Sequence, residues 1–111
     1  MSFLDFLTRS GPSSKSPDPA DLTHLATWTR THHGVEAFIE PRTTVTDVTA
    51  VLVAHDGEWT RRVVGERAAH RLSTTLKIPV YDVRKVGYPQ RMRDHDARTR
   101  IAARRDRLSD L

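Results

Sequence analysis

The spacing of apolar residues predicts a helix early in the chain. From residue 19 to residue 33, apolar side chains such as Leu22 and Leu25 recur with the 3.6-residue period of an amphipathic helix. Asp18 stands directly before Pro19, and this pair is typical of a helix start, because aspartate caps free backbone N–H groups and proline fits the first turn. We therefore expect the first helix at about 19–33.

Three segments after this helix follow the patterns of β-strands. Residues 35–42 alternate apolar and polar side chains, which is typical of a half-buried strand. Residues 47–55 are apolar at consecutive central positions, so we expect a central strand that is covered on both faces. Residues 58–64 form a third predicted strand. The dipeptide Asp56-Gly57 before it is typical of a two-residue type I′ hairpin turn.

The predicted turn gathers several polar side chains. With a two-residue loop, His55 and Glu58 would close the hairpin as a cross-strand pair, and Ala54 and Trp59 would form the next pair. His55, Asp56 and Glu58 are also residue types that serve in acid/base or metal sites. We favour the structural interpretation, because a hairpin turn accounts for all three positions without a ligand.

Further along the chain the apolar period returns to that of a helix. Residues 65–78 predict a second helix that Pro79 ends, and residues 79–83 predict a short fourth strand. A loop then leads to a third helix at about 90–108. The order α-β-β-β-α-β-α predicts an α+β fold, a single domain with an antiparallel three-strand meander packed against helices.

The chain divides into three predicted parts. Residues 1–18 are expected to form a flexible N-terminal tail and linker, because residues 10–19 contain three Pro and four Ser but no apolar side chain. Residues 19–88 are the predicted α+β core domain, and residues 89–111 the basic C-terminal helix. The apolar side of this helix is thin, so we expect it to lie on the domain, to project from it, or to become ordered on a partner.

The composition excludes several kinds of site. The 111 residues include no cysteine, so disulfides, thiolate zinc sites and cysteine nucleophiles are excluded. The six histidines form no HxxxH or HxH pair, and no glycine-rich dinucleotide loop follows a strand. We therefore expect no metal, no cofactor and no catalytic residue. No apolar run approaches the ~20 residues of a membrane span, and a cytoplasmic location is the default expectation.

Positive charge is concentrated towards the C-terminus. Residues 1–83 carry nine Lys and Arg against ten Asp and Glu, a net charge of −1, whereas residues 84–111 carry nine against four, a net charge of +5. One-sided positive charge is typical of a phosphate-binding surface, but a solvated helix with i,i+4 ion pairs has the same composition. The predicted nucleic-acid-binding residues surround the start of the second helix and follow the fourth strand: Arg61, Arg62, Arg67, Arg71, Arg84, Lys85, Arg91, Arg93, Arg98, Arg100, Arg104 and Arg105.

Two groups of domains share parts of the predicted order. Residues 19–77 resemble the double-stranded RNA-binding domain in topology, and the resemblance implies that cations at the start of the second helix contact phosphates. The lysine-rich signature of that family is absent. The order α-β-β-β-α-β is also similar to the restriction-endonuclease-like core, which implies metal ligands on the second and third strands. Asp47 stands at the matching place on the second strand, but the third reads TRRVV and lacks the second carboxylate.

Longer stretches of the chain resemble a group of small basic proteins from GC-rich bacteria. The stretches are GVEAFIEPRT, VLVAHDGEWTRRVVG and IPVYDVRKVGYPQRMRDHDAR. Some members of that group carry an oxidoreductase label, so the resemblance implies redox activity as one possibility. No motif for haem, flavin or nicotinamide accompanies it in the sequence.

Three functional hypotheses follow from the sequence. The first is a non-catalytic binding module for RNA or a ribonucleoprotein such as the ribosome, which would act through the twelve cationic residues. The second is a protein-interaction adaptor, which would use the apolar residues 3–7 and the C-terminal helix. The third is a small enzyme of the oxidoreductase-labelled type. A positive surface joining the C-terminal helix to Arg61 and Arg67 would favour the first hypothesis.

Overall fold

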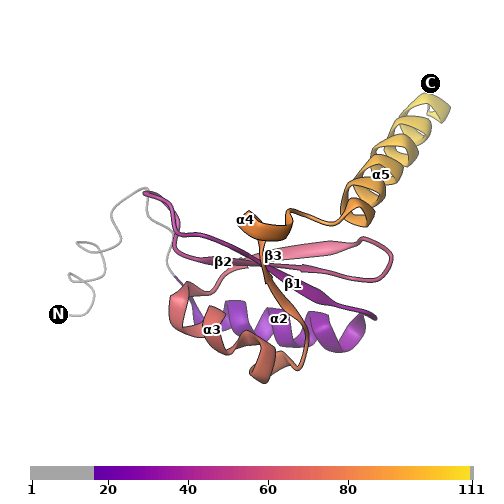
Figure 1. Ribbon diagram of the computed structural model, residues 1–111. Helices are drawn as coiled ribbons and strands as arrows, with labels where there is room; N and C mark the ends of the chain where they lie inside the picture. The colour runs from indigo at the N-terminus through magenta and orange to yellow at the C-terminus, as the bar shows by residue number, and fades with distance from the viewer. Residues whose placement is uncertain (1–16, 111) are drawn as a thin grey trace.

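A four-stranded mixed β-sheet lies at the centre of the computed structural model, which describes residues 17–110 (Figure 1). Residues 1–16 and 111, and with them the apolar residues 3–7 of the predicted tail, lie outside the described residues. The elements are α2 Pro19–Thr31, β1 Glu36–Glu40, β2 Thr49–Val53, β3 Trp59–Val63, α3 Gly65–Leu76, β4 Val80–Asp82, α4 Val83–Val86 and α5 Gln90–Ser109. The α+β class and the order of the predicted elements are confirmed.

The sheet is larger than the predicted three-strand meander. Its strand order is β3-β2-β1-β4, in which β1, β2 and β3 are antiparallel neighbours and β4 runs parallel to β1. The prediction of a purely antiparallel three-strand sheet was therefore incomplete. The reason is that α3 carries the chain back across one face, so that β4 joins the free edge of β1 in the same direction. Ala37 pairs with Val80 and Ile39 with Asp82 in this parallel ladder.

Helices α2 and α3 lie side by side on one face of the sheet (Figure 1). Leu25 of α2 and Leu72 of α3 are fully buried there against Ala37, Leu52 and other residues of the strands. Burial of leucine side chains of this kind contributes about 1.5–3 kcal/mol each to folding. This cluster is the main core, and it fixes the position of both helices on the sheet.

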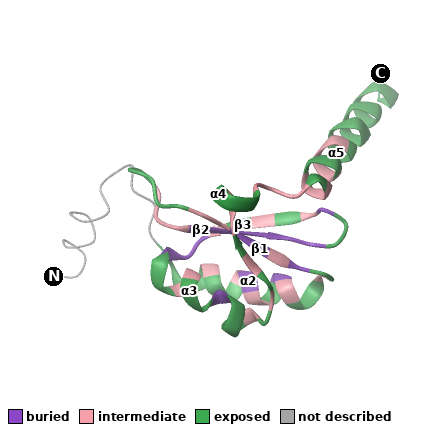
Figure 2. Cartoon of the chain, viewed as in Figure 1, coloured by how far each residue is buried: buried purple, intermediate pink, exposed green. Residues whose placement is uncertain are grey.

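The opposite face of the sheet carries a second, smaller core. Phe38, Val51 and Val53 are buried beneath Tyr88 and Met92, which come from the loop after α4 and from the start of α5. Strand β2 is thus buried at all five positions (Figure 2). The prediction of a central strand covered on both faces is confirmed.

The helices on the main face start and stop for local reasons. Asp18 caps α2 as predicted, because its side chain accepts a hydrogen bond of 2.8 Å from the backbone N–H of Ala20, and Pro19 is the first helical residue. Helix α3 ends at Lys77, which adopts a left-handed conformation with φ of 57°. Pro79 follows two residues later and prevents the helix from continuing.

Helix α4 is a single turn in a region that the sequence predicted to be the end of a strand and a loop. The side chain of Asp82 accepts a hydrogen bond of 2.9 Å from the backbone N–H of Arg84 and so starts the turn. Gly87 ends it with φ of 70°. The turn then leads into Pro89 and α5, and it directs the C-terminal helix towards the β2–β3 hairpin.

Candidate functional site

The β2–β3 hairpin has a longer loop than the predicted two-residue turn. Val53 pairs with Trp59, the N–H of Gly57 donates to the carbonyl of Ala54, and the N–H of Ala54 donates to the carbonyl of Glu58. Gly57 has φ of 94°, whereas Asp56 does not take a positive φ. The loop therefore spans three residues, with a turn closed by a left-handed glycine, and the predicted type I′ turn was wrong.

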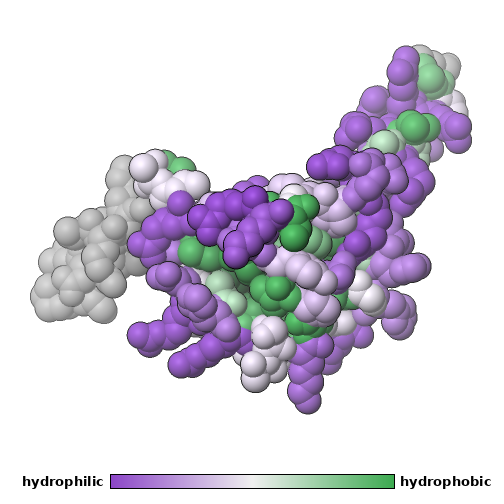
Figure 3. All heavy atoms as spheres, in the orientation of Figure 1, coloured by the Kyte–Doolittle hydropathy of each residue, from purple (hydrophilic) through white to green (hydrophobic). Residues whose placement is uncertain are grey.

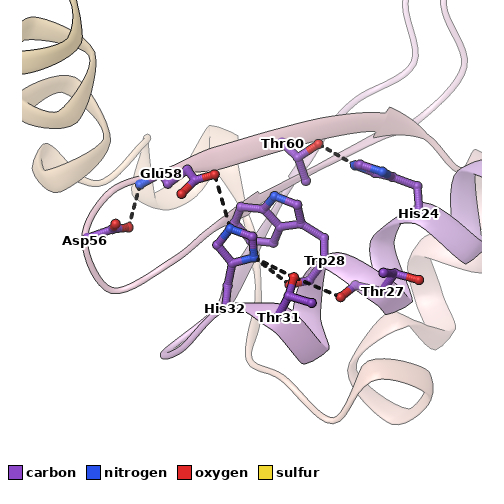
Figure 4. Close-up of polar contacts among 8 residues, drawn as sticks. All are labelled: His24, Thr27, Trp28, Thr31, His32, Asp56, Glu58 and Thr60. Atoms are coloured by element: carbon purple, nitrogen blue, oxygen red, sulfur yellow. Dashed lines mark hydrogen bonds and ion pairs between the residues drawn. The ribbon is translucent and has the colours of Figure 1, made fainter. Parts of the chain in front are cut away.

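This shift changes the partners of the polar side chains at the turn. The predicted His55–Glu58 and Ala54–Trp59 cross-strand pairs are not formed. Glu58 instead reaches α2, where its carboxylate lies 3.2 Å from Nε2 of His32 (Figure 4). The His32 ring stacks on Trp28 at a centroid distance of 3.8 Å, and its Nδ1 lies 2.8 Å from the Trp28 carbonyl oxygen. The side chains at the turn therefore fix the hairpin to the end of α2.

Helix α5 packs directly on the glycine of the turn. Gly57 is buried although it lies in an exposed loop, because the first turn of α5 covers it. A Cβ atom at this position would collide with the backbone carbonyl of Arg91 and would lie 2.9 Å from the Cβ of His95. Only glycine permits this approach between the hairpin and the helix backbone.

Side-chain contacts hold the first half of α5 on the hairpin and on the start of β1. Nε of Arg91 donates to the Ala54 carbonyl at 2.9 Å, and its Nη2 donates to Glu36 at the start of β1 at 2.6 Å. The indole N–H of Trp59 donates to Asp96 at 2.8 Å. Further along, Arg98 donates to the Asp56 carbonyl at 3.0 Å. Arg91 and Arg98, both predicted to bind nucleic acid, thus make contacts within the fold.

The second half of α5 leaves the domain. Every residue from Arg98 to Asp110 is exposed, and the helix extends away from the sheet in Figure 2. We call residues 98–110 the projecting segment; its first residue, Arg98, still reaches the Asp56 carbonyl of the hairpin. It contains five Arg and two Asp, a net charge of +3. Of the alternatives that the sequence left open for this helix, the structure shows that its start lies on the domain and its end projects.

The projecting segment has one side that is both cationic and apolar. Ile101, Arg104, Arg105 and Leu108 follow the i, i+3, i+4, i+7 spacing, so they share one side of the helix, whereas Asp106 lies on the opposite side. The side chains of Ile101 and Leu108 are 52% and 59% exposed. Arg104 and Arg105, both predicted phosphate ligands, therefore stand between two exposed aliphatic residues.

The predicted cluster around the start of α3 is divided between the two faces of the sheet. Arg61 and Arg62 are adjacent on β3 and point to opposite faces. Arg61 pairs with Glu40 of β1, and Arg62 lies 3.5 Å from Asp21 of α2. The predicted residues of α3 are Arg67 and Arg71, which are both exposed. In Figure 1, α3 and the projecting segment lie at opposite ends of the sheet.

The remaining predicted cations differ in the contacts that their side chains make. Arg84 forms a two-point contact with Asp82, at 3.2 Å through Nε and 2.9 Å through Nη2. This contact lowers the pKa of Asp82 to about 2. Arg93 donates to Gln90 on the same helix. Lys85 and Arg100 are exposed and form no ion pair with the residues that the structure describes.

A hollow that no sequence pattern predicted lies at the other end of the sheet. It has a volume of about 630 Å³ and lies between α3 and the carboxyl ends of the parallel strands β1 and β4. We call it the edge hollow. Glu66, His70 and Ser73 of α3 line it with the i, i+4, i+7 spacing of one helix side. This spacing is visible in the sequence, but only the parallel pairing of β1 with β4 shows what faces it.

The described residues offer few other chemical sites. Within residues 17–110, no three His, Asp or Glu side chains are grouped as metal ligands. Asp47, which stands where a nuclease-like core would place a metal ligand, instead pairs with Arg42 at 2.9 Å and accepts the N–H of Val48. No helix in this range is both long enough and apolar enough to cross a membrane.

Comparison with known proteins gives no match. No protein-family model, no curated protein and no solved structure matches the chain.

Proposed function

We propose that the chain is a non-catalytic binding module that contacts RNA or a ribonucleoprotein through the projecting segment of α5. The observation that carries this proposal is the division of α5 into two halves. The first half is fixed to the hairpin through Gly57, Arg91 and Asp96. The second half is exposed throughout and has a net charge of +3.

A helix held at one end suits the binding of a polyanion. Folding the projecting segment on a partner would cost ~1–2 kcal/mol of backbone entropy for each residue that becomes ordered. The docked first half lowers this cost, because the helix is already started and its direction is set. At 1.5 Å per residue, the projecting segment presents its cations along roughly 20 Å of helix axis.

The arginines of the projecting segment are available for phosphate contacts. Arg100, Arg104 and Arg105 have no carboxylate partner among the described residues. A guanidinium group matches the planar, two-point geometry of phosphate oxygens. By contrast, Arg61 and Arg62 are paired with carboxylates. The free energy needed to break these ion pairs would offset part of the free energy gained from phosphate contacts. The proposal therefore rests on α5 and gives the β3 arginines a minor part.

A second candidate function is a protein-interaction adaptor that uses the same segment. Ile101 and Leu108 favour it, because they are exposed aliphatic residues on one side of a helix. Such a side fits a hydrophobic groove on a partner, and the flanking Arg104 and Arg105 would then face acidic residues at the rim. RNA contacts need the arginines and not the aliphatic residues. Substitution of Ile101 and Leu108 should therefore impair binding to a protein partner but not binding to RNA.

Salt dependence and one double variant separate the two candidates. RNA binding is expected to weaken steeply between 50 and 200 mM salt, because phosphate contacts release counterions. Fluorescence anisotropy with a labelled mixed-sequence RNA measures this directly. Ile101→Ser/Leu108→Ser should keep RNA affinity within about twofold, since it removes no charge. Absence of RNA binding at low salt, together with a protein partner whose binding this variant abolishes, would replace the proposal with the adaptor.

A further inference from the structure

The edge hollow is separate from the proposed RNA surface and has its own chemistry. It lies at the carboxyl end of β1, whereas Arg91 of α5 contacts Glu36 at the start of the same strand. Figure 3 shows apolar side chains gathered between the hydrophilic residues of α4 and those of the lower helices. The apolar part of the hollow consists of Ile39, Val80 and Ala69 with their neighbours. Its volume of about 630 Å³ lies within the ~300–1,000 Å³ that is usual for small-molecule sites.

Two guanidinium groups at the rim of the hollow keep donors for a ligand. Arg42 uses Nε and Nη2 for Asp47, and Arg84 uses Nε and Nη2 for Asp82. In both residues Nη1 has no partner within the described residues. The carboxylates restrain the two side chains, although these are 64% and 67% exposed. The rim therefore carries two restrained guanidinium groups, each with a donor left for a carboxylate or similar oxyanion.

The wall formed by α3 offers the opposite kind of group. Glu66, His70 and Ser73 line the hollow and form no side-chain hydrogen bond with the described residues. Glu66 is an acceptor when ionised, so it suits an ammonium group. The lining itself is neutral, with two arginines against Glu66 and Asp82, and Asp47, which pairs with Arg42, brings the net charge of the site to −1. This balance disfavours a ligand with two or more negative charges.

We propose that the edge hollow binds a small amino-carboxylate with the chemistry of a free amino acid that has an apolar side chain. Arg42 and Arg84 receive its carboxylate through Nη1, Glu66 receives its ammonium group, and the apolar side chain lies against Ile39 and Val80. This site goes beyond the proposed RNA-binding function and does not depend on it, since no residue of α5 lines the hollow.

Four probes test this site in the full-length protein by two-dimensional amide NMR. They are leucine, N-acetylleucine without the ammonium group, 3-methylbutylamine without the carboxylate, and adenosine monophosphate as a dianion. Leucine is expected to shift the amides of Ala69 and Val80 saturably, with a Kd on the order of 1 mM or lower. Both truncated analogues should bind at least about tenfold more weakly, because each lacks one of the two charged groups through which leucine contacts the site.

A matched pair of variants checks the role of the rim. Arg84→Gln should weaken leucine binding about tenfold, whereas Lys85→Gln, which removes the adjacent exposed cation, should leave it unchanged. Three results would overturn the proposal. They are no saturable shift at the hollow with leucine, valine, isoleucine or phenylalanine, tighter binding of adenosine monophosphate than of every amino acid tested, or equal losses in the two variants.

Discussion

Gly57 of the β2–β3 hairpin lies in direct contact with the backbone of Arg91 at the start of α5. The contact is so close that a Cβ atom on Gly57 would overlap the Arg91 carbonyl. This packing sets the direction of α5 and hence the place of the projecting segment. Because the same glycine takes a φ of 94°, one residue both closes the hairpin and admits the helix.

Replacement of this glycine is expected to detach α5 from the hairpin. Gly57→Ala should cost about 1–3 kcal/mol through strain at positive φ, and the overlap with Arg91 should in addition displace the helix. The indole N–H of Trp59 donates to Asp96. Its NMR chemical shift and its rate of hydrogen exchange with water therefore report whether α5 is docked. We expect fast exchange in this variant.

Gly87→Ala is the control for that experiment. Gly87 also has a positive φ, of 70°, but a Cβ atom there would meet nothing within 4 Å. It should therefore show the cost of backbone strain while the Trp59–Asp96 bond persists. If Trp59 remained equally protected in both variants, α5 would not be held in the way described.

Arg91 is expected to stabilise the fold more than its neighbouring arginine. Arg91→Met removes one donor from the Ala54 carbonyl, which keeps the N–H of Gly57, and one from the Glu36 carboxylate, which keeps the Tyr81 hydroxyl. The free energy of unfolding should fall by about 1–3 kcal/mol, because two partly buried hydrogen bonds, one of them charge-assisted, are lost. Arg93→Met removes only a contact to Gln90 on an exposed surface and should change it by less than about 0.5 kcal/mol. Urea unfolding of both variants provides the comparison, and equal effects would argue against a structural role for Arg91.

His24 is expected to make stability fall in mild acid. Burial and the nearby Arg62 guanidinium lower the pKa of His24 below its usual value of 6.5, against the opposing effect of Asp21. The unfolded chain therefore binds the proton more tightly, and stability is lost as the pH falls through 6.5. The His24→Gln variant lacks this titration, so wild type should lose more stability than the variant between pH 7.5 and 5. Parallel stability curves for the two proteins would refute this.

The sequence allowed the elements to be predicted well, because their signals are local. Asp18 at the start of α2, the alternation in β1 and the apolar centre of β2 depend only on nearby residues. The hairpin was predicted from Asp56-Gly57, but its loop length was wrong by one residue. The dipeptide fits both a two-residue and a three-residue loop, and tertiary contacts of Glu58 with His32 and of Gly57 with α5 accompany the longer form.

The arrangement of the candidate sites depended on long-range contacts that no local pattern carries. The sequence shows that Arg61, Arg67 and Arg104 are cationic, but not that α3 and α5 lie at opposite ends of the sheet. Likewise, the side of α3 with Glu66 and His70 faces a hollow only because β4 pairs parallel with β1 and forms the opposite wall. Composition therefore identified a basic region, and the fold divided it into a docked half, a projecting segment and separate arginines.

The most direct test of the proposed function compares two double variants that each remove two exposed charges from a helix. Arg104→Gln/Arg105→Gln changes the projecting segment, and Arg67→Gln/Arg71→Gln changes α3. We predict that the α5 variant loses roughly tenfold in RNA affinity at low salt and that the slope of log affinity against log salt falls by about 1.4, while the α3 variant stays within about twofold of wild type. Equal losses in the two variants, or no loss in the α5 variant, would contradict the account.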